Sequence, residues 1–279
     1  MAYLIADSGS STCDWCLVNI NNKKKFTTTG INPYFLTQPQ IINLLIAEAL
    51  PKIKNITIEK IFFYGTGLGN LTNIKIIKAA LKTVFGSVVI EVNTDMLAAS
   101  RSLLLNKKGM ACILGTGSNT AFYDGKKNTK NSPGLGYVLG DEGSGSYLGK
   151  KVLQHYLYNT FDEDLNAIFE AKFNTTKEII LDNIYKQPFA NKYLASFSVF
   201  LSENRGHYMI ENIIEDSLHD FFFQHLYKFT ESWKYPINFT GSIAFAFKDV
   251  IKEICNNNEL ELGNISKQPM DGLVAYHTK

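Results

Sequence analysis

The stretch MAYLIADSGSSTCDWCLV, residues 1–18, decides the fold of this chain. An apolar run at residues 3–6 ends at a single carboxylate, Asp7, and a loop of small residues precedes a second strand-like run at residues 13–18. This order of strand, tight loop and strand predicts a β-hairpin with a carboxylate and hydroxyls at its turn. Backbone N–H groups and hydroxyls in such a turn can wrap a phosphate, and Asp7 could reach a Mg²⁺ held by that phosphate. An ordinary Gly/Ser hairpin has the same pattern, so both interpretations stay open here.

The same pattern returns about 105 residues later. An apolar strand at residues 109–114 ends in the loop Gly-Thr-Gly-Ser-Asn, residues 115–119, and a further strand follows at residues 120–123. This is a weak internal duplication. We expect each copy to begin one domain, and two such loops could grip a phosphate chain from both sides.

Composition and charge narrow the classes of protein to consider. A length of 279 residues suits two domains, and 45% hydrophobic with 19% charged residues is typical of a globular protein. The net charge of +2 gives no electrostatic case for binding nucleic acid or a membrane surface. The sequence has no run of 18 consecutive apolar residues, so it predicts no membrane-spanning helix. The N-terminus lacks a basic, signal-like region. Together with four sparse cysteines, these features predict a cytoplasmic location.

The pair Cys13 and Cys16 has the spacing of a redox or metal half-site. Both residues fall within the second predicted strand, where positions i and i+3 point to opposite faces. No second Cys pair or nearby His completes a zinc set. Structural cysteines are therefore the favoured interpretation.

Asp95 lies between a predicted strand at residues 88–92 and a predicted helix at residues 96–105. Aspartate commonly caps a helix N-terminus, which is the plain interpretation. A carboxylate at the carboxyl end of a strand can also point into a ligand site, which is the functional one. The position alone leaves both open.

Other polar turns are candidate ligand positions. Asn32 follows a strand and could offer both a donor and an acceptor, although Asn and Pro also form plain turns. The glycine-dense stretch at residues 134–146 contains paired acids and leads into a predicted helix at about 147–158. A short strand at residues 237–239 ends in Thr-Gly-Ser before a predicted helix at 243–255, a joint that suits a nucleotide.

The region from residue 164 to 233 is predicted to be helical, ending in one long helix over residues 207–233 with a wide apolar face. That face could serve the core or a homodimer contact, and the core is the simpler expectation. Its three histidines have no acid or Cys at ligand spacing, so we interpret them as packing or surface residues. The tail at residues 268–277 predicts a short closing helix.

Taken in order, these blocks resemble the sugar-kinase/Hsp70/actin superfamily. The resemblance covers nearly the whole chain and is strongest to the N-acetylglucosamine kinase branch that groups with the BadF/BadG/BcrA/BcrD ATPases. Its most diagnostic blocks are residues 115–119 and 140–144, Gly-Asp-Glu-Gly-Ser. It implies an α/β protein of two ribonuclease-H-like (actin-like ATPase) domains, with ATP and sugar in an interdomain cleft. The domains would span residues 1–106 and 107–267, the second with a helical insertion, and the helix at about 268–279 would pack back on the first.

The resemblance also implies roles for individual residues. The ATP phosphates would be held by Ser8, Gly9, Ser10, Ser11, Thr12, Gly115, Thr116, Gly117 and Ser118. Gly241 and Ser242 would contact the adenosine, and Asp7 would approach Mg²⁺. The amino sugar would be bound by Asn32, Asn119, Gly136 and Asp141, with Asp95 as the catalytic base. Many relatives have Lys-Thr where this chain has Thr12-Cys13, so one cationic phosphate contact is missing.

The activity implied is transfer of a phosphoryl group from ATP, with Mg²⁺, to the 6-hydroxyl of an amino sugar, most simply N-acetylglucosamine. N-acetylmuramic acid and glucosamine are alternative substrates. A non-catalytic actin-like nucleotide-binding module is an alternative of another class. An activator ATPase for acyl-CoA dehydratases is disfavoured because Cys112 and Cys255 lack an iron–sulfur motif. A P-loop enzyme is excluded because no G-x-x-x-x-G-K-[ST] occurs.

Overall fold

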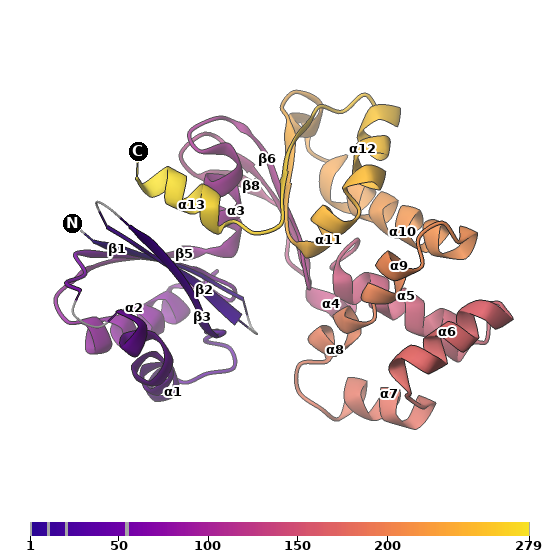
Figure 1. The fold of residues 1–279 in the computed structure, drawn as a ribbon. Helices are drawn as coiled ribbons and strands as arrows, with labels where there is room; N and C mark the ends of the chain where they lie inside the picture. Colours follow the sequence, from indigo (N-terminus) through magenta and orange to yellow (C-terminus); the bar gives the residue numbers. More distant parts are fainter. Residues whose placement is uncertain (1, 10–11, 20–21, 54–55, 279) are drawn as a thin grey trace. The chain divides into compact units, whose positions relative to one another are not determined.

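The computed structural model describes residues 2–9, 12–19, 22–53 and 56–278. The chain divides into two compact units, each built around its own sheet (Figure 1). Unit 1 comprises Met1–Lys107, Gly125–Lys127 and Gln268–Lys279. Unit 2 comprises Lys108–Asp124 and Asn128–Lys267. The short final segment of the chain therefore belongs to the unit that the first segment forms.

The sheet of unit 1 has five strands in the order β3-β2-β1-β4-β5. They are β1 (Tyr3–Ser8), β2 (Thr12–Val18), β3 (Lys23–Thr29), β4 (Lys60–Gly65) and β5 (Val89–Thr94). β1 pairs with β2 as an antiparallel hairpin and with β4 in parallel, and β4 pairs with β5 in parallel. The hairpin predicted from the first residues is confirmed.

Both faces of this sheet are covered by helices (Figure 1). Leu4 and Ala6 of β1 pack in one apolar cluster with residues of α1 (Gln38–Leu44), the π-helix η1 (Leu45–Ala49), the 3-10 turn η2 (Leu50–Ile53) and α2 (Leu71–Phe85). Ile5 points to the opposite face, in a cluster with residues of α3 (Asp95–Leu104) and α13 (Met270–His277). This alternation is the period of two that a strand imposes on its side chains. The closing helix predicted for the tail is confirmed as α13.

The four cysteines of the chain are free and buried. Cys13 packs with the first of these clusters and Cys16 with the second, so the two side chains lie on opposite faces of the sheet. That arrangement confirms the prediction that they are structural and do not form a redox pair.

The sheet of unit 2 also has five strands, in the order β10-β9-β6-β7-β8. They are β6 (Gly109–Leu114), β7 (Ser118–Tyr123), β8 (Asn128–Asn131), β9 (Ile237–Thr240) and β10 (Leu262–Ser266). Counted from the first strand of each unit, the two sheets have the same order: third, second, first, fourth, fifth. In both, the first two strands form an antiparallel hairpin and the first pairs with the fourth in parallel. The predicted internal duplication is confirmed.

Unit 2 carries the larger set of helices (Figure 1). They are α4 (Gly136–Leu139), α5 (Gly145–Leu157), α6 (Glu163–Phe173), α7 (Lys177–Tyr185), α8 (Ala190–Ser196), α9 (Val199–Glu203), α10 (Tyr208–Phe221), α11 (Ser242–Ala246) and α12 (Lys248–Asn257). Most lie in the chain between β8 and β9, where the sequence predicts helices. Buried aromatic residues such as Phe169, Phe200 and Phe221 fill the core they share with β6 and β9.

Two helix predictions are wrong in detail. The helix expected over residues 207–233 ends as α10 at Phe221, continues as a π-helix, η3 (Phe222–Leu226), and finishes with a separate 3-10 turn, η4 (Thr230–Trp233). The Tyr227 N–H donates to the Phe222 carbonyl at 3.0 Å, a spacing one residue longer than an α-helix uses. The helix expected over 243–255 is broken at Phe247, whose φ of −111° and ψ of 33° are not helical. None of the helices in the described ranges is long and apolar enough to cross a membrane.

Candidate active site

Two aspartates of unit 1 lie at the carboxyl ends of its parallel strands. Asp7 of β1 lies beside Tyr64 of β4, which lies beside Asn93 of β5, and Asp95 follows at the start of α3. On its other side Asp7 pairs with Asp14 of β2. Because parallel strands end at the same edge of a sheet, this register gathers three carboxylates at one edge. Asp14 is the member that the sequence analysis missed.

These carboxylates affect one another's ionisation. Burial, together with the charges of Asp95 and Asp14, raises the pKa of Asp7 to about 7. Burial also raises the pKa of Asp95 to about 6, although backbone N–H groups, first that of Met96, oppose the rise. Both side chains keep partial solvent exposure. A carboxylate whose pKa lies near neutral pH is suited to accept a proton during a reaction.

The three neighbouring carboxylates suit a Mg²⁺ ion that binds together with the phosphates of a nucleotide. Among the residues that the structure describes, no group of three or more His, Cys, Asp or Glu side chains could hold a metal ion by itself. Mg²⁺ typically keeps several waters and is held by one or two carboxylates together with substrate phosphates. Asp7, a hard oxygen donor beside two like charges, matches that mode because a cation there would relieve the repulsion.

Asp95 is the first residue of α3, and Thr94 is its N-cap. The Thr94 hydroxyl accepts the Leu97 N–H at 3.2 Å, which leaves capping to the threonine. The Asp95 Oδ1 atom accepts the N–H of its neighbour Met96 at 2.8 Å. The plain interpretation of Asp95 as the capping residue is therefore wrong, and its carboxylate at the helix N-terminus stays a candidate for chemistry.

Hydrogen bonds of Ser8 and Gly9 stabilise the start of the first hairpin loop. The Gly9 N–H donates to the Thr12 carbonyl at 2.9 Å and closes the turn. The buried Ser8 hydroxyl accepts the Ile31 N–H at 2.8 Å and lies 3.1 Å from the Ile31 carbonyl oxygen, to which it donates. Ser8 thus joins the hairpin to the segment that contains Asn32. Ser10 and Ser11, both predicted to bind phosphate, lie outside the described residues.

Asn32 is buried in a turn that its own side chain stabilises. Its Oδ1 atom accepts the Tyr34 N–H at 2.9 Å, and its Nδ2 atom donates to the Thr66 hydroxyl at 3.3 Å. Gly67, with φ of +75°, packs so closely that an added Cβ would lie 2.7 Å from Asn32 Oδ1. The glycine-rich loop after β4 therefore supports Asn32, a role that the sequence analysis did not assign to it.

The second hairpin loop is held against the N-terminus of α5. The Gly145 N–H donates to the Gly115 carbonyl at 2.8 Å, and the Ser146 N–H donates to the Thr116 carbonyl at 3.0 Å. The Thr116 residue itself is exposed. The buried Ser118 hydroxyl oxygen has no hydrogen-bond partner among the described residues. A buried hydroxyl without a partner is costly and is typical of a site that a ligand completes.

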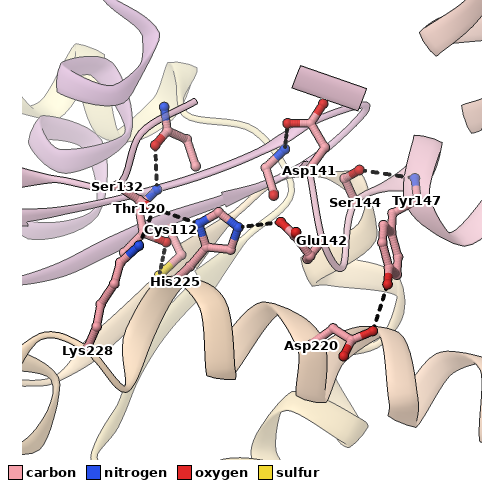
Figure 2. A network of polar contacts seen from close by, with 12 residues as sticks. Cys112, Thr120, Ser132, Asp141, Glu142, Ser144, Tyr147, Asp220, His225 and Lys228 are labelled. Carbon is pink, nitrogen blue, oxygen red and sulfur yellow. Dashed lines mark hydrogen bonds and ion pairs between the residues drawn. The ribbon is translucent and has the colours of Figure 1, made fainter. Parts of the chain in front are cut away.

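Asp141 lies beside this second loop (Figure 2). Its Oδ1 atom accepts the Ser118 N–H at 3.3 Å, and a Cβ on Gly117 would lie 2.9 Å from its Oδ2 atom. Asp141 has a φ of 59°, a left-handed conformation that L-residues rarely adopt. Burial raises the pKa of its carboxyl, while the Ser118 N–H lowers it. The structure thus brings predicted phosphate and sugar residues of unit 2 into contact.

Gly241, predicted to contact the adenosine, is packed against the start of the same loop. A Cβ at this position would lie 2.1 Å from the Leu114 carbonyl oxygen, and its φ is +127°. Only glycine fits such a backbone approach. Ser242, the first residue of α11, is exposed. The Thr-Gly-Ser joint and the second hairpin loop therefore form one surface of unit 2.

Of the remaining predicted sugar residues, Asn119 lies next to an exposed segment at residues 133–139 and Gly136 lies within it. The half-buried Asn119 accepts the Thr120 N–H through Oδ1 at 2.8 Å. Its Nδ2 atom would lie 3.6 Å from a Cβ on Gly134. Gly136, at the start of α4, is exposed and has a φ of +72°.

One polar chain in unit 2 was not predicted (Figure 2). The buried His225 is bonded to Ser132 through Nδ1 at 2.8 Å and to Glu142 through Nε2 at 2.9 Å. Lys228 donates to the Ser132 hydroxyl at 3.0 Å. Glu142 lies 83 residues from His225 in the chain, so no local spacing could reveal the pair. The prediction that His225 is a packing residue describes its burial but misses these contacts.

Comparison with solved structures identifies the class of fold first. The structure of MreB 5 of Spiroplasma citri bound to AMPPNP aligns over 99% of this chain and 94% of that chain, with a TM-score of 0.57 and 10% identity. A protein of Chromobacterium violaceum, provisionally described as an N-acetylglucosamine kinase, aligns over 99% and 98% with a TM-score of 0.75 and 14% identity. Together with the repeated strand order, these likenesses define the actin-like ATPase fold with two ribonuclease-H-like domains.

A further similarity then shows the family. A protein of Porphyromonas gingivalis, also provisionally described as an N-acetylglucosamine kinase, is 34% identical over 99% of this chain and 98% of that chain, with a TM-score of 0.95. The chain belongs to this N-acetylglucosamine kinase-like family of the sugar-kinase/Hsp70/actin superfamily. Neither a protein-family model nor a curated protein sequence matches the chain.

Proposed function

We propose that the protein is an ATP-dependent amino-sugar kinase that phosphorylates the 6-hydroxyl of N-acetylglucosamine. The observation that carries this proposal is Asp95, a partly buried carboxylate with a pKa of about 6 at the carboxyl end of β5. A sugar hydroxyl is a weak nucleophile, and a carboxylate poised near neutral pH can accept its proton. The membership of a family that includes the Porphyromonas gingivalis protein supports a sugar as the acceptor.

In the proposed reaction, Asp95 accepts the proton of the sugar 6-hydroxyl while that oxygen attacks the γ-phosphorus of ATP. The bond from the γ-phosphorus to the bridging oxygen breaks, and ADP leaves. Bound Mg²⁺ supplies charge neutralisation for the transferred phosphoryl group, and Asp7 is the residue that would hold it. Transfer of this kind needs positioning more than covalent catalysis, so the residues that position the ligands matter as much as the base.

The remaining predicted residues take binding roles in this proposal. Gly9 and Thr12 in unit 1, and Gly115, Thr116, Gly117 and Ser118 in unit 2, would bind phosphates, and Gly241 with Ser242 would bind the adenosine. The partnerless Ser118 hydroxyl supports a ligand at its loop. Asn32, Asn119, Gly136 and Asp141 would bind the sugar, and Asp141 is already beside Ser118. The AMPPNP bound by MreB 5 on this fold supports ATP as the nucleotide.

The test of the substrate is a coupled ADP-release assay with N-acetylglucosamine, N-acetylmuramic acid, glucosamine, N-acetylmannosamine and glucose. We expect saturable, sugar-dependent ADP release, with the highest kcat/KM for N-acetylglucosamine. A preference for N-acetylmuramic acid or glucosamine would replace the sugar but keep the reaction. Binding of ATP without any sugar-dependent ADP release would overturn the proposal in favour of a non-catalytic nucleotide-binding module.

The test of the base is Asp95→Asn, which keeps an oxygen for the Met96 N–H but cannot accept the proton. We expect kcat to fall by about 10²- to 10⁴-fold while ATP binding is retained. Asp216→Asn, an exposed aspartate of α10, is the matched control and should turn over like the wild type. Turnover of Asp95→Asn near the wild-type rate would remove Asp95 from the role of base.

A further inference from the structure

The segment 133–141 in unit 2 is closed at its base by a single histidine. Ser132 precedes this segment and Glu142 follows it, and His225 is hydrogen-bonded to both. The segment itself exposes apolar side chains: Leu135, Val138 and Leu139 are 56%, 69% and 75% exposed. Exposed side chains contribute little to holding a segment in place, so the polar contacts at its base gain importance.

The direction of the hydrogen bonds in this chain follows from chemistry. Lys228 can only donate, so the Ser132 hydroxyl accepts from it at 3.0 Å and directs its own proton to His225 Nδ1. In the tautomer that accepts from Ser132 at Nδ1, the His225 Nε2 atom carries the one ring N–H and donates it to the Glu142 carboxylate. In this arrangement each polar group from Lys228 to Glu142 has a hydrogen-bond partner, with a cation at one end and an anion at the other.

The position of His225 is itself fixed by α10 and η3. The His225 ring stacks on Phe221, with ring centroids 5.0 Å apart. Phe221 also packs against Gly143, where an added Cβ would lie 2.7 Å from the Phe221 Cβ. The residue before Phe221, Asp220, accepts a hydrogen bond from the Tyr147 hydroxyl at 2.7 Å. Figure 2 shows two contacts between the stretch after Asp141 and this helical region, Glu142 with His225 and Tyr147 with Asp220. The packing of Gly143 on Phe221 is a third.

The base of the segment also touches the residues proposed to bind the sugar. The Ser132 N–H donates to the Thr120 carbonyl at 2.8 Å, directly after Asn119. Glu142 directly follows Asp141, whose left-handed φ of 59° needs support from its surroundings. The chain through His225 thus links the Asn119 side of the proposed sugar surface to the Asp141 side.

We infer that His225 is a positioning residue for sugar binding: by bridging Ser132 and Glu142 it holds the segment 133–141, and with it Gly136 and Asp141, in the geometry that binds the sugar. This inference rests on the proposed function. It assigns His225 no contact with the reacting atoms. Its effect is expected in the KM for the sugar, because the nucleotide would be bound by other residues.

The experiment compares His225→Phe with His207→Phe in the ADP-release assay, with KM and kcat measured separately for sugar and for ATP. His225→Phe keeps a ring beside Phe221 and removes both hydrogen bonds. His207 also pairs with a carboxylate in unit 2, Asp162 at 2.9 Å, and is the matched control. We expect His225→Phe to raise the sugar KM on the order of 10- to 100-fold, with the ATP KM unchanged and His207→Phe like the wild type.

Two milder variants are less prone to misfold and test the hydrogen bonds between Ser132, His225 and Glu142 one at a time. His225→Gln can still donate to Glu142 but loses the bond to Ser132, so it should rescue part of the sugar KM. Ser132→Ala should give an intermediate KM as well. Hydrogen exchange of the amides in 133–141 should be faster in each of these variants than in His207→Phe, and this readout needs no turnover.

The outcomes separate this inference from the proposed function. If the wild type shows no sugar-dependent ADP release, the proposed function fails, and with it the assignment to sugar binding. If the wild type turns over while the His225 variants keep its sugar KM and its exchange rates in 133–141, the positioning role alone is overturned. Parallel rises in the KM for sugar and for ATP would also overturn it, since they would indicate a general structural role.

Discussion

The two hairpin loops of this protein occupy the same position in two sheets of the same strand order, yet their surroundings differ in chemistry. Beside the first loop, Asp7, Asp14 and Asp95 gather at one sheet edge, where burial and then the charges of Asp95 and Asp14 raise the pKa of Asp7 to about 7. Beside the second loop, backbone groups of α5 hold residues 115 and 116, and one carboxylate, Asp141, is bonded to Ser118. A duplicated topology can thus carry two different tasks. We interpret the first loop as the side that handles a cation and a proton, and the second as the side that binds neutral and anionic groups of ligands.

The largest stability effect is expected from the second loop, at Gly241. Gly241→Ala would place a Cβ 2.1 Å from the Leu114 carbonyl oxygen in a backbone conformation, φ +127° and ψ 163°, that is almost restricted to glycine. We expect a loss of about 3 kcal/mol or more in the free energy of unfolding, measured by urea denaturation. Such a loss would show that the close packing of Gly241 against the Leu114 carbonyl holds the second loop in place.

Gly69→Ala is the control for this substitution, because a Cβ there would meet nothing within 4 Å. It should leave the free energy of unfolding close to the wild-type value. If Gly241→Ala unfolded at the wild-type urea concentration, the tight packing of the second loop could not explain how it differs from the first.

The second largest effect is expected beside the first loop, at Asp7, where a substitution should increase the free energy of unfolding. The folded-state pKa of Asp7, about 7, lies above its ordinary value of 3.8, so ionising Asp7 costs stability in the folded protein. That cost is absent below pH 4 and grows as the pH rises through 7. Asp7→Asn removes it, so the variant should be more stable than the wild type at pH 8, on the order of 2 kcal/mol, and equally stable near pH 4. Its Mg²⁺-dependent turnover should fall in the same samples.

Urea denaturation across this pH range provides the measurement, with Asp216→Asn as an exposed control. A stability difference between Asp7→Asn and the wild type that did not change with pH would show that the pKa of Asp7 is not raised in the folded protein. A gain in stability joined to a loss of activity would identify the first loop as a site where function is maintained at the expense of stability.

The hairpins and the acids at their ends could be predicted from the sequence because they depend on local patterns. An apolar run followed by small residues fixes β1 and β6, and the position of Asp95 after a strand follows from the same pattern. Contacts between distant residues could not be predicted in this way. His225 meets Glu142 across 83 residues, and Asp95 becomes a neighbour of Asp7 only through the strand order.

Errors in the helices have equally physical origins. The apolar period continues past Phe221, but one π-turn shifts the following residues around the axis, and a pattern of 3.6 residues cannot reveal that shift. Asp95 was a plausible cap by residue type, yet Thr94 lies one position earlier and its hydroxyl reaches the Leu97 N–H. Residue preferences there allow either side chain to cap, and only the backbone geometry decides.

The smallest effect is expected at Thr12 in the first loop. This residue is exposed at the start of β2, in the position where the family resemblance of the sequence implies a lysine. Thr12→Lys would add a cation beside the carboxylates of the first loop. We expect the KM for ATP to fall about two- to fivefold at low salt, which is the size of an exposed charge contact. The decrease should be smaller at about 0.5 M NaCl because salt screens the added charge.

The control is Thr72→Lys, at an exposed threonine of α2, which should leave the KM for ATP unchanged at both salt concentrations. The added cation should also lower the pKa of Asp7, and so move the acid limb of the pH–rate profile to lower pH. If Thr12→Lys changed neither the KM for ATP nor that limb, the first loop would not contact the phosphates, and the two-loop comparison would reduce to a nucleotide site built on the second loop.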